Sequence, residues 1–185
     1  MKRILGRAFG RLRGAQRAFG RDERAATAIE FGILSVPFFG IIAAILQTSI
    51  ILLASQILES AVNDASRAIR IGQAASFTVD TFRSRICDGL YGLFGDCSGL
   101  HVQVSEITNF QSANAPPPVA ADCEAPCDWS NPERWTAGQG KSIMLVQVYY
   151  RYPVLIPLGP LGMSNLPDGS RLIGSTNVFQ NEPFS

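Results

Sequence analysis

Residues 25–54 read AATAIEFGILSVPFFGIIAAILQTSIILLA, and this stretch decides how the chain is organised. The 23 positions from Phe31 to Leu53 within it carry no charge. At about 1.5 Å per residue, a helix of this length crosses the roughly 30 Å hydrocarbon core of a bilayer. A cleaved secretory signal usually has an apolar region of only about 7–15 residues. We therefore predict an uncleaved transmembrane helix over residues 26–54.

Charge is unevenly distributed on the two sides of this segment. Residues 1–25 carry eight basic and two acidic side chains, a net charge of +6, whereas residues 26–185 carry eight basic and thirteen acidic ones, a net charge of −5. Basic residues that flank a membrane span stay in the cytoplasm. We expect residues 1–25 to be a basic cytoplasmic leader and residues 55–185 a periplasmic domain. Because the span accounts for the arginines, no nucleic-acid partner is predicted.

The helical pattern continues beyond the apolar run in a more polar form. Apolar residues recur every three or four positions over residues 57–69, with charged and amide side chains between them. This spacing is typical of an amphipathic helix that packs on a domain. Gly72 is a suitable residue to end it. One helix of roughly 45 residues is predicted, half in lipid and half against the outer domain.

The rest of the chain predicts a short helix over residues 76–90 and strands over 100–107, 141–154 and 171–180, with a loop over 109–140. The predicted fold class is α+β, with a long N-terminal transmembrane and amphipathic helix packed on a small antiparallel sheet.

Alternation within the strands also predicts which side chains face the core. In the first strand, His101 falls on the face opposite to Val102, where we expect it to be exposed or locally hydrogen-bonded. In the third strand the apolar candidates are Leu172, Val178 and Phe179.

All four cysteines, Cys87, Cys97, Cys123 and Cys127, follow the span. An even number of cysteines in an exported domain favours disulfides. We prefer pairing between neighbours, Cys87–Cys97 and Cys123–Cys127, and two other connectivities remain open. Zinc is disfavoured, because the C-x9-C and C-x3-C spacings are poor for it and His101 is the only histidine. No metal and no cofactor are predicted.

Residues that carry chemistry are scarce. No Ser-His-Asp, Cys-His or phosphate-loop arrangement can be assembled from this sequence, so no catalytic residue and no enzymatic activity are predicted. A periplasmic thiol enzyme that uses Cys123 and Cys127 is kept as an alternative.

The ionisable residue that stands out is Glu30, which lies at the border of the apolar run. A carboxylate at the edge of a hydrocarbon core is costly unless it is paired or reaches the interface. Glu30 is therefore either an interfacial residue or the partner of a cation. If the chain were cut before Ala26, the new amino group would lie near the membrane surface and could pair with Glu30 of another subunit.

Residues 25–32 resemble the processing motif of type IV prepilins and pseudopilins, in which a glycine precedes the cut and glutamate is fifth in the mature chain. Counted from Ala26, Glu30 is fifth. More specifically, the chain resembles the TadE-like family, minor pseudopilins of the tight-adherence (Tad/Flp) pilus system. That resemblance also rests on residues 65–72, 82–87, 146–153 and 178–184.

The resemblance implies a pilin-like fold and a structural part in building the Tad pilus, which supports adhesion and biofilm formation. The implied location is the inner membrane. The implied partners are other pilins and pseudopilins, the inner-membrane assembly platform and a prepilin peptidase that cuts between Ala25 and Ala26. Ala25 stands where the motif has glycine, so both a cleaved and an uncleaved chain stay open. The alternative function is a membrane-anchored periplasmic adhesin or scaffold unrelated to pili.

Overall fold

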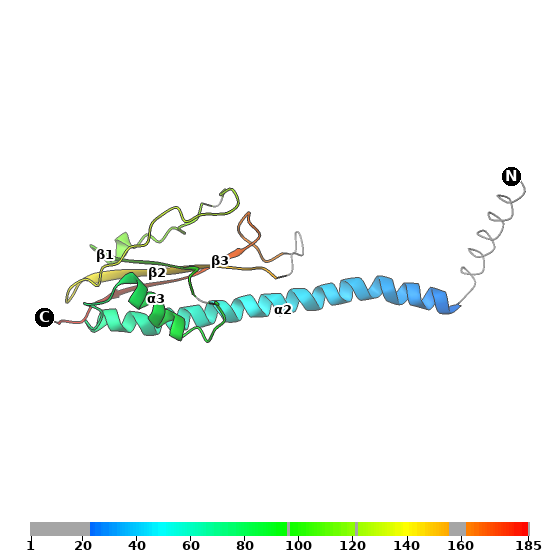
Figure 1. The fold of residues 1–185 in the computed structure, drawn as a ribbon, viewed down its shortest axis with the longest axis horizontal. Helices are drawn as coiled ribbons and strands as arrows, with labels where there is room; N and C mark the ends of the chain where they lie inside the picture. Colours follow the sequence, from blue (N-terminus) through cyan, green and yellow to red (C-terminus); the bar gives the residue numbers. More distant parts are fainter. Residues whose placement is uncertain (1–22, 96, 121, 156–161, 185) are drawn as a thin grey trace, which may run out of the picture. The chain divides into compact units, whose positions relative to one another are not determined.

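The computed structural model describes residues 23–95, 97–120, 122–155 and 162–184. Nearly all of the predicted leader therefore lies outside the described residues. The elements follow in the order α2 (Glu23–Arg70), α3 (Val79–Asp88), β1 (Leu100–Ile107), the short 3-10 helix η1 (Phe110–Ser112), β2 (Ile143–Tyr152) and β3 (Arg171–Gln180) (Figure 1). The predicted α+β fold, with its long N-terminal helix and small antiparallel sheet, is confirmed.

The chain divides into two compact units, Met1–Ile45 and Leu46–Ser185. The sheet and α3 belong to the second unit, whereas α2 contributes its first half to one unit and its second half to the other. The second unit is called the domain below.

α2 is one helix of 48 residues, with Pro37 inside it. In its second half a stripe of buried residues recurs every three or four positions, which places them on one face. The buried stripe consists of Ile51, Ala54, Leu58, Ala61, Val62, Ala65, Ala68 and Ile69. The stripe confirms the predicted amphipathic continuation, and it begins earlier than the predicted residues 57–69.

The C-terminal end of α2 is closed by a turn at Gly72. Its φ of 78° lies in the left-handed region, which glycine adopts without steric cost. The Gly72 N–H donates a 3.0 Å hydrogen bond to the carbonyl oxygen of Ile69. The helix thus ends near the predicted glycine.

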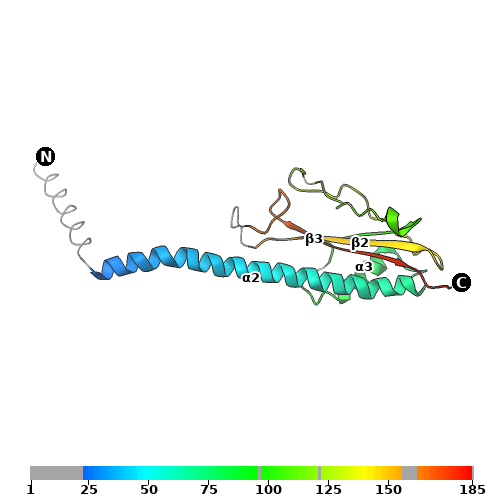
Figure 2. The same cartoon turned by 180° about the vertical axis from the view of Figure 1, so that it is seen from behind.

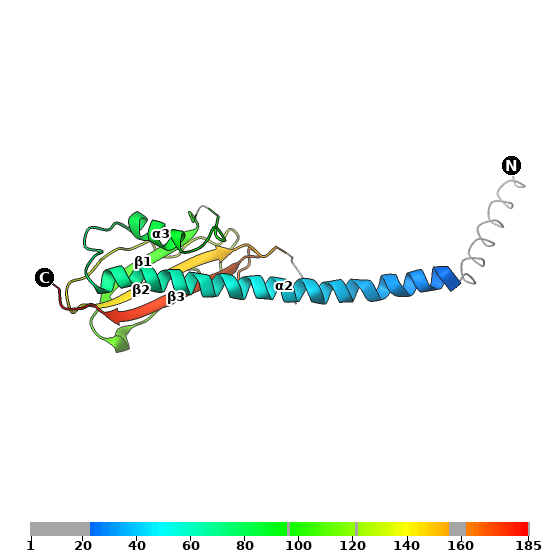
Figure 3. The same cartoon turned by 90° about the horizontal axis from the view of Figure 1, so that it is seen from below.

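Three antiparallel strands form one sheet in the order β1-β2-β3. In this register Leu100 pairs with Tyr150, and Ile143 pairs with both Ile107 and Gln180. Figure 3 shows α2 and α3 side by side over one face of the sheet. On that face the strands bury Val102, Val104, Met144, Val146, Val148 and Ile173, which form the main core with the stripe of α2 and with Phe82 and Ile86 of α3.

The segment between η1 and β2 covers the opposite face of the sheet, as Figure 2 shows from behind. A second, smaller cluster lies there, with Val119, Cys127 and Leu166 at its centre and Trp129 and Leu172 packed around it.

This covering segment corrects one expectation about the strands. His101 is only 3% exposed, so its predicted exposure is wrong, although the expected local contact is present: the Gln103 amide nitrogen lies 3.3 Å from His101 Nε2. Of the three apolar candidates in β3, Phe179 is in the main core, whereas Leu172 packs against the second cluster.

Candidate functional site

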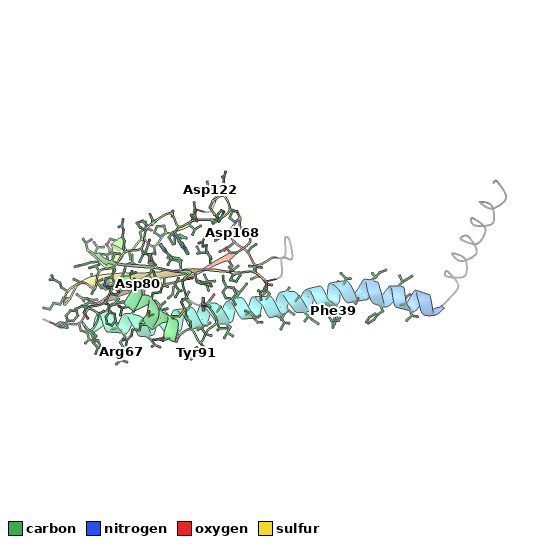
Figure 4. The ribbon with its side chains drawn as sticks, in the orientation of Figure 1. Phe39, Arg67, Asp80, Tyr91, Asp122 and Asp168 are labelled. Atoms are coloured by element: carbon green, nitrogen blue, oxygen red, sulfur yellow. A yellow bond between two sulfur atoms is a disulfide. The ribbon has the colours of Figure 1, made fainter. Side chains whose placement is uncertain are left out.

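The first half of α2 exposes a continuous series of large apolar side chains. Fourteen of them lie between Ile29 and Leu53, with exposed fractions from 37% to 74%, and Phe39 projects away from the helix in Figure 4. Exposed apolar surface of this extent marks an interaction with a membrane or with other proteins. Within the part of the chain that the structure describes, one helix is long and apolar enough to cross a membrane.

Glu30 lies on α2 at the start of this apolar surface, and its side chain is exposed. Ala25 and Ala26 belong to the same helix and precede Glu30 by about one turn. The three residues named by the processing motif are therefore successive parts of one helix. Cleavage between Ala25 and Ala26 stays a prediction.

The small residues of the apolar half leave space on the helix surface. A Cβ atom placed on Gly32 or Gly40 would have no neighbour within 4 Å. The Ser35 hydroxyl donates a 2.9 Å hydrogen bond to the Gly32 carbonyl oxygen, so this polar group is satisfied inside the helix. A second helix could therefore approach closely without meeting an unsatisfied hydroxyl.

Both preferred disulfides are present. Cys87–Cys97, with Cα atoms 5.9 Å apart, joins the last turn of α3 to the turn that precedes β1. Cys123–Cys127, with Cα atoms 5.3 Å apart, closes a short loop in the segment that covers the sheet. All four cysteines are paired. Among the described residues, no group of three His, Cys, Asp or Glu side chains could hold a metal ion.

A polar cleft of about 560 Å³ was not predicted from the sequence. It lies where α3, the start of β1 and the covering segment meet, and Arg83, His101, Trp129 and Glu133 contribute to its lining. These residues come from three separate segments, so no local motif indicates the cleft.

An ion pair and a backbone contact fix one wall of this cleft. Arg83 donates hydrogen bonds to Glu133 and to Asp80, whose side chain is 79% exposed. The second oxygen of Glu133 accepts a 2.9 Å hydrogen bond from the Val102 N–H. The hydrogen bond from Arg83 to Glu133 is the main reason that the pKa of Arg83 is raised.

An aromatic stack forms another wall. The ring of His101 lies 4.4 Å from that of Trp129, at an interplanar angle of 17°, and the Arg151 guanidinium lies 4.8 Å from the same indole. Burial lowers the pKa of His101 below 6.5, against the attraction of Glu133, and the nearby charges of Arg83 and Arg151 lower it further. This shift favours the neutral form of the imidazole.

The segment after β3 closes the far end of the domain. The Asn181 side-chain amide donates to the carbonyl oxygens of Ala137 and Gln139, at 3.2 and 3.0 Å. A Cβ atom on Gly72 would lie 2.7 Å from the ring of Phe184. The chain end thus packs directly on the turn that follows α2.

Together these features define a class of protein: an α+β chain whose apolar N-terminal helix can span a membrane and continues as the packed spine of a disulfide-bonded domain. Within that class, residues 25–67 of the chain match the family model described as TadE-like protein. The match confirms the family resemblance and covers the apolar half of α2 together with most of its buried stripe. No curated protein and no solved structure matches the chain.

Proposed function

We propose that this chain is a non-enzymatic, single-pass inner-membrane component of Tad pilus assembly, acting as a minor pseudopilin. The observation that carries this proposal is the TadE-like match over residues 25–67. The matched residues are those that would contact neighbouring membrane helices and those that attach α2 to its own domain. The domain would then offer a protein-binding surface to other pilus components.

Packing beside another helix is supported by the surface of the apolar half. Helix association in membranes depends on close van der Waals contact, which small residues allow. The open space at Gly32 and Gly40 is not used by any described part of this chain. In the proposed function, helices of pilins and of the assembly platform fill it.

The proposed orientation is supported by charge and by the disulfides. The net charge of +6 over residues 1–25 favours a cytoplasmic location for that end. Two disulfides require an oxidising compartment, and both lie in the domain, which is consistent with the periplasm.

Glu30 has a defined part in this proposal. If a prepilin peptidase cuts between Ala25 and Ala26, the new ammonium group lies about one helical turn from Glu30. In an assembly of subunits, Glu30 of one chain would neutralise the amino group of its neighbour, which removes the cost of an unpaired carboxylate at the hydrocarbon border.

The decisive experiment combines a mass measurement with a count of pili. The chain is extracted from membranes of cells with and without the prepilin peptidase, and its intact mass is measured. A mature chain that starts at Ala26 only in the presence of the peptidase supports the pseudopilin assignment. Deletion of the gene should abolish pili in electron micrographs, and re-expression should restore them. Normal pili in the deletion strain, with lost adhesion, would instead favour the adhesin or scaffold alternative.

The thiol-enzyme alternative has its own test. Cys127 is completely buried within the second cluster, which limits access to its sulfur. We expect no labelling of the native protein by a maleimide unless a reductant is added first. Labelling without a reductant would favour the enzyme.

A further inference from the structure

The rest of the domain packs on residues of α2 that also belong to the predicted transmembrane segment, residues 26–54. Gln47 and Ile51 are 7% and 3% exposed and belong to the domain, although both lie inside the uncharged stretch Phe31–Leu53 of the predicted span. On the same turns, Leu46 and Leu53 remain 58% and 54% exposed. This part of α2 therefore has one face on protein and another face that is apolar and uncovered.

The length of the apolar run shows where the hydrocarbon must reach. The run begins at Phe31, directly after Glu30. A core of about 30 Å needs roughly 20 helical residues, which end at Ile50, and any tilt of the helix increases that number. A boundary before Leu46 would leave only residues 31–45, or about 22 Å of helix. With Glu30 placed at the lipid surface, the lipid therefore extends to the residues of α2 at which the domain begins.

A small apolar pocket lies at this level. It has a volume of about 180 Å³ and is lined by Leu46, Gln47, Ile50 and Ile51 of α2 and by Tyr152, Pro153 and Leu155, which form the end of β2 and the residues after it. The residues that line it carry no charge. Leu155 is 71% exposed, and Tyr152 is an aromatic residue of the type that is enriched at membrane interfaces.

The nearest charged residue in β2 is directed elsewhere. Arg151 donates to the carbonyl oxygen of Cys127 and lies over Trp129, on the face of the sheet that carries the covering segment. The charged side chain of β2 therefore points away from the pocket, and it does not enter hydrocarbon when the pocket contacts lipid.

We infer that this end of the domain is immersed in the adjacent leaflet, and that the pocket between α2 and Tyr152–Leu155 receives a lipid acyl chain. The inference rests on the membrane insertion in the proposed function but not on any role in pili. The domain is then held by a second membrane contact, in addition to its transmembrane helix.

The test places a fluorescent reporter at Leu155 of the full-length chain. The Leu155→Trp variant is reconstituted in phosphatidylcholine vesicles whose acyl chains carry bromine at carbons 6 and 7, and in unbrominated vesicles. The wild-type chain, measured in parallel, supplies the signal of Trp129 and Trp135. The matched control is Phe110→Trp, because Phe110 is also apolar and 55% exposed but follows Ile107, at the opposite end of the sheet.

We expect brominated lipid to remove at least half of the emission added by Leu155→Trp and none of that added by Phe110→Trp, whereas aqueous acrylamide quenches only the latter. Acrylamide quenching of both reporters alike, without bromine quenching at position 155, would place that end of the domain in water. Protection from both quenchers would show that protein covers it. Either result overturns the inference. Flotation of the vesicles tests insertion separately: a chain that does not float refutes the membrane part of the proposed function.

Discussion

The backbone N–H of Glu182 donates a 2.8 Å hydrogen bond to the carbonyl oxygen of Arg70, the last residue of α2. A helix leaves its last carbonyl groups without partners, and here the chain that leaves β3 satisfies one of them. The same segment places Asn181 on the turn before β2 and Phe184 on Gly72. The final residues of the chain thus hold the far end of the helix on the sheet.

Gly72→Ala tests this closure. An alanine there must keep a φ near 78° and also displace the ring of Phe184, so we expect the free energy of unfolding to fall by about 1–3 kcal/mol. Urea unfolding of the chain in detergent measures the change. The matched control is Gly169→Ala, because Gly169 has a similar φ of 81° but open space around it. Equal losses for the two variants would show that Phe184 does not pack on the turn.

Phe82→Ala should be the more damaging of two phenylalanine truncations. Phe82 is completely buried and its ring centroid lies 4.9 Å from that of Trp135, so the variant loses both burial and an aromatic contact. We expect a loss of about 3–5 kcal/mol. Phe110→Ala, at an exposed position, should stay within about 0.5 kcal/mol of the wild type. Similar unfolding midpoints for the two variants would contradict the described core.

Removal of the two disulfides should have unequal effects. The Cys87–Cys97 bridge closes the longer loop, with a sequence separation of 10 against 4, and Cys97 packs in the main core. From loop entropy alone we expect the double serine variant of that pair to lose about 2.7 kcal/mol, and that of Cys123–Cys127 about 2 kcal/mol. Chemical unfolding of each variant gives the order. A larger loss of unfolding free energy for the Cys123–Cys127 variant would show that loop entropy does not decide the order.

The stability of the domain should depend on pH through His101. Its folded pKa is lowered below 6.5 by burial, so the unfolded chain binds more protons in the window just below pH 6.5. This contribution is fully present above pH 6.5 and is lost as the pH falls through that window. Thermal unfolding between pH 7.5 and 5 should show the decrease, and His101→Gln should reduce its slope. Glu133, Arg83 and Arg151, the charged groups that act on the imidazole, are left unchanged in this comparison. An unchanged slope in the variant would assign the effect to other groups.

Ala25→Gly should increase processing if the peptidase acts on this chain. The substitution restores the glycine that the prepilin motif carries before the cut, and Ala26 and Glu30 stay in place. We expect a larger fraction of mature chain by intact mass in cells that contain the peptidase, and no change in cells that lack it. The same fraction for alanine and glycine would argue against cleavage at this bond.

Local patterns predicted most of the fold. The bounds of β1 and β3 agree with the expected residues 100–107 and 171–180, because side-chain alternation is visible in the sequence itself. The preferred cysteine pairs are also close in sequence, and both are present. The burial of Ile51 was missed for a physical reason: a residue that faces lipid and one that faces a protein core are both apolar, so composition alone does not separate them.

Contacts between distant segments could not be predicted. Arg83 and Glu133 are 50 positions apart, and their ion pair exists only because the covering segment folds back over the sheet. The same segment buries His101. Side-chain alternation along β1 predicted the correct face of the sheet for His101, but it did not indicate that another segment packs on that face. Asn181 is a similar case, since its carbonyl partners lie more than 40 positions away.

The continuity of α2 has a mechanical consequence. In the domain the helix runs along the strands, as the views in Figures 1 and 3 agree, and its buried stripe extends from Ile51 to Ile69. A pull directed along the axis of this part of α2 therefore loads the whole stripe in shear, together with the hydrogen bond at Arg70. Shear requires many contacts to yield at once, whereas peeling breaks them one after another. Tension along this part of α2 is thus shared by all the residues of the stripe.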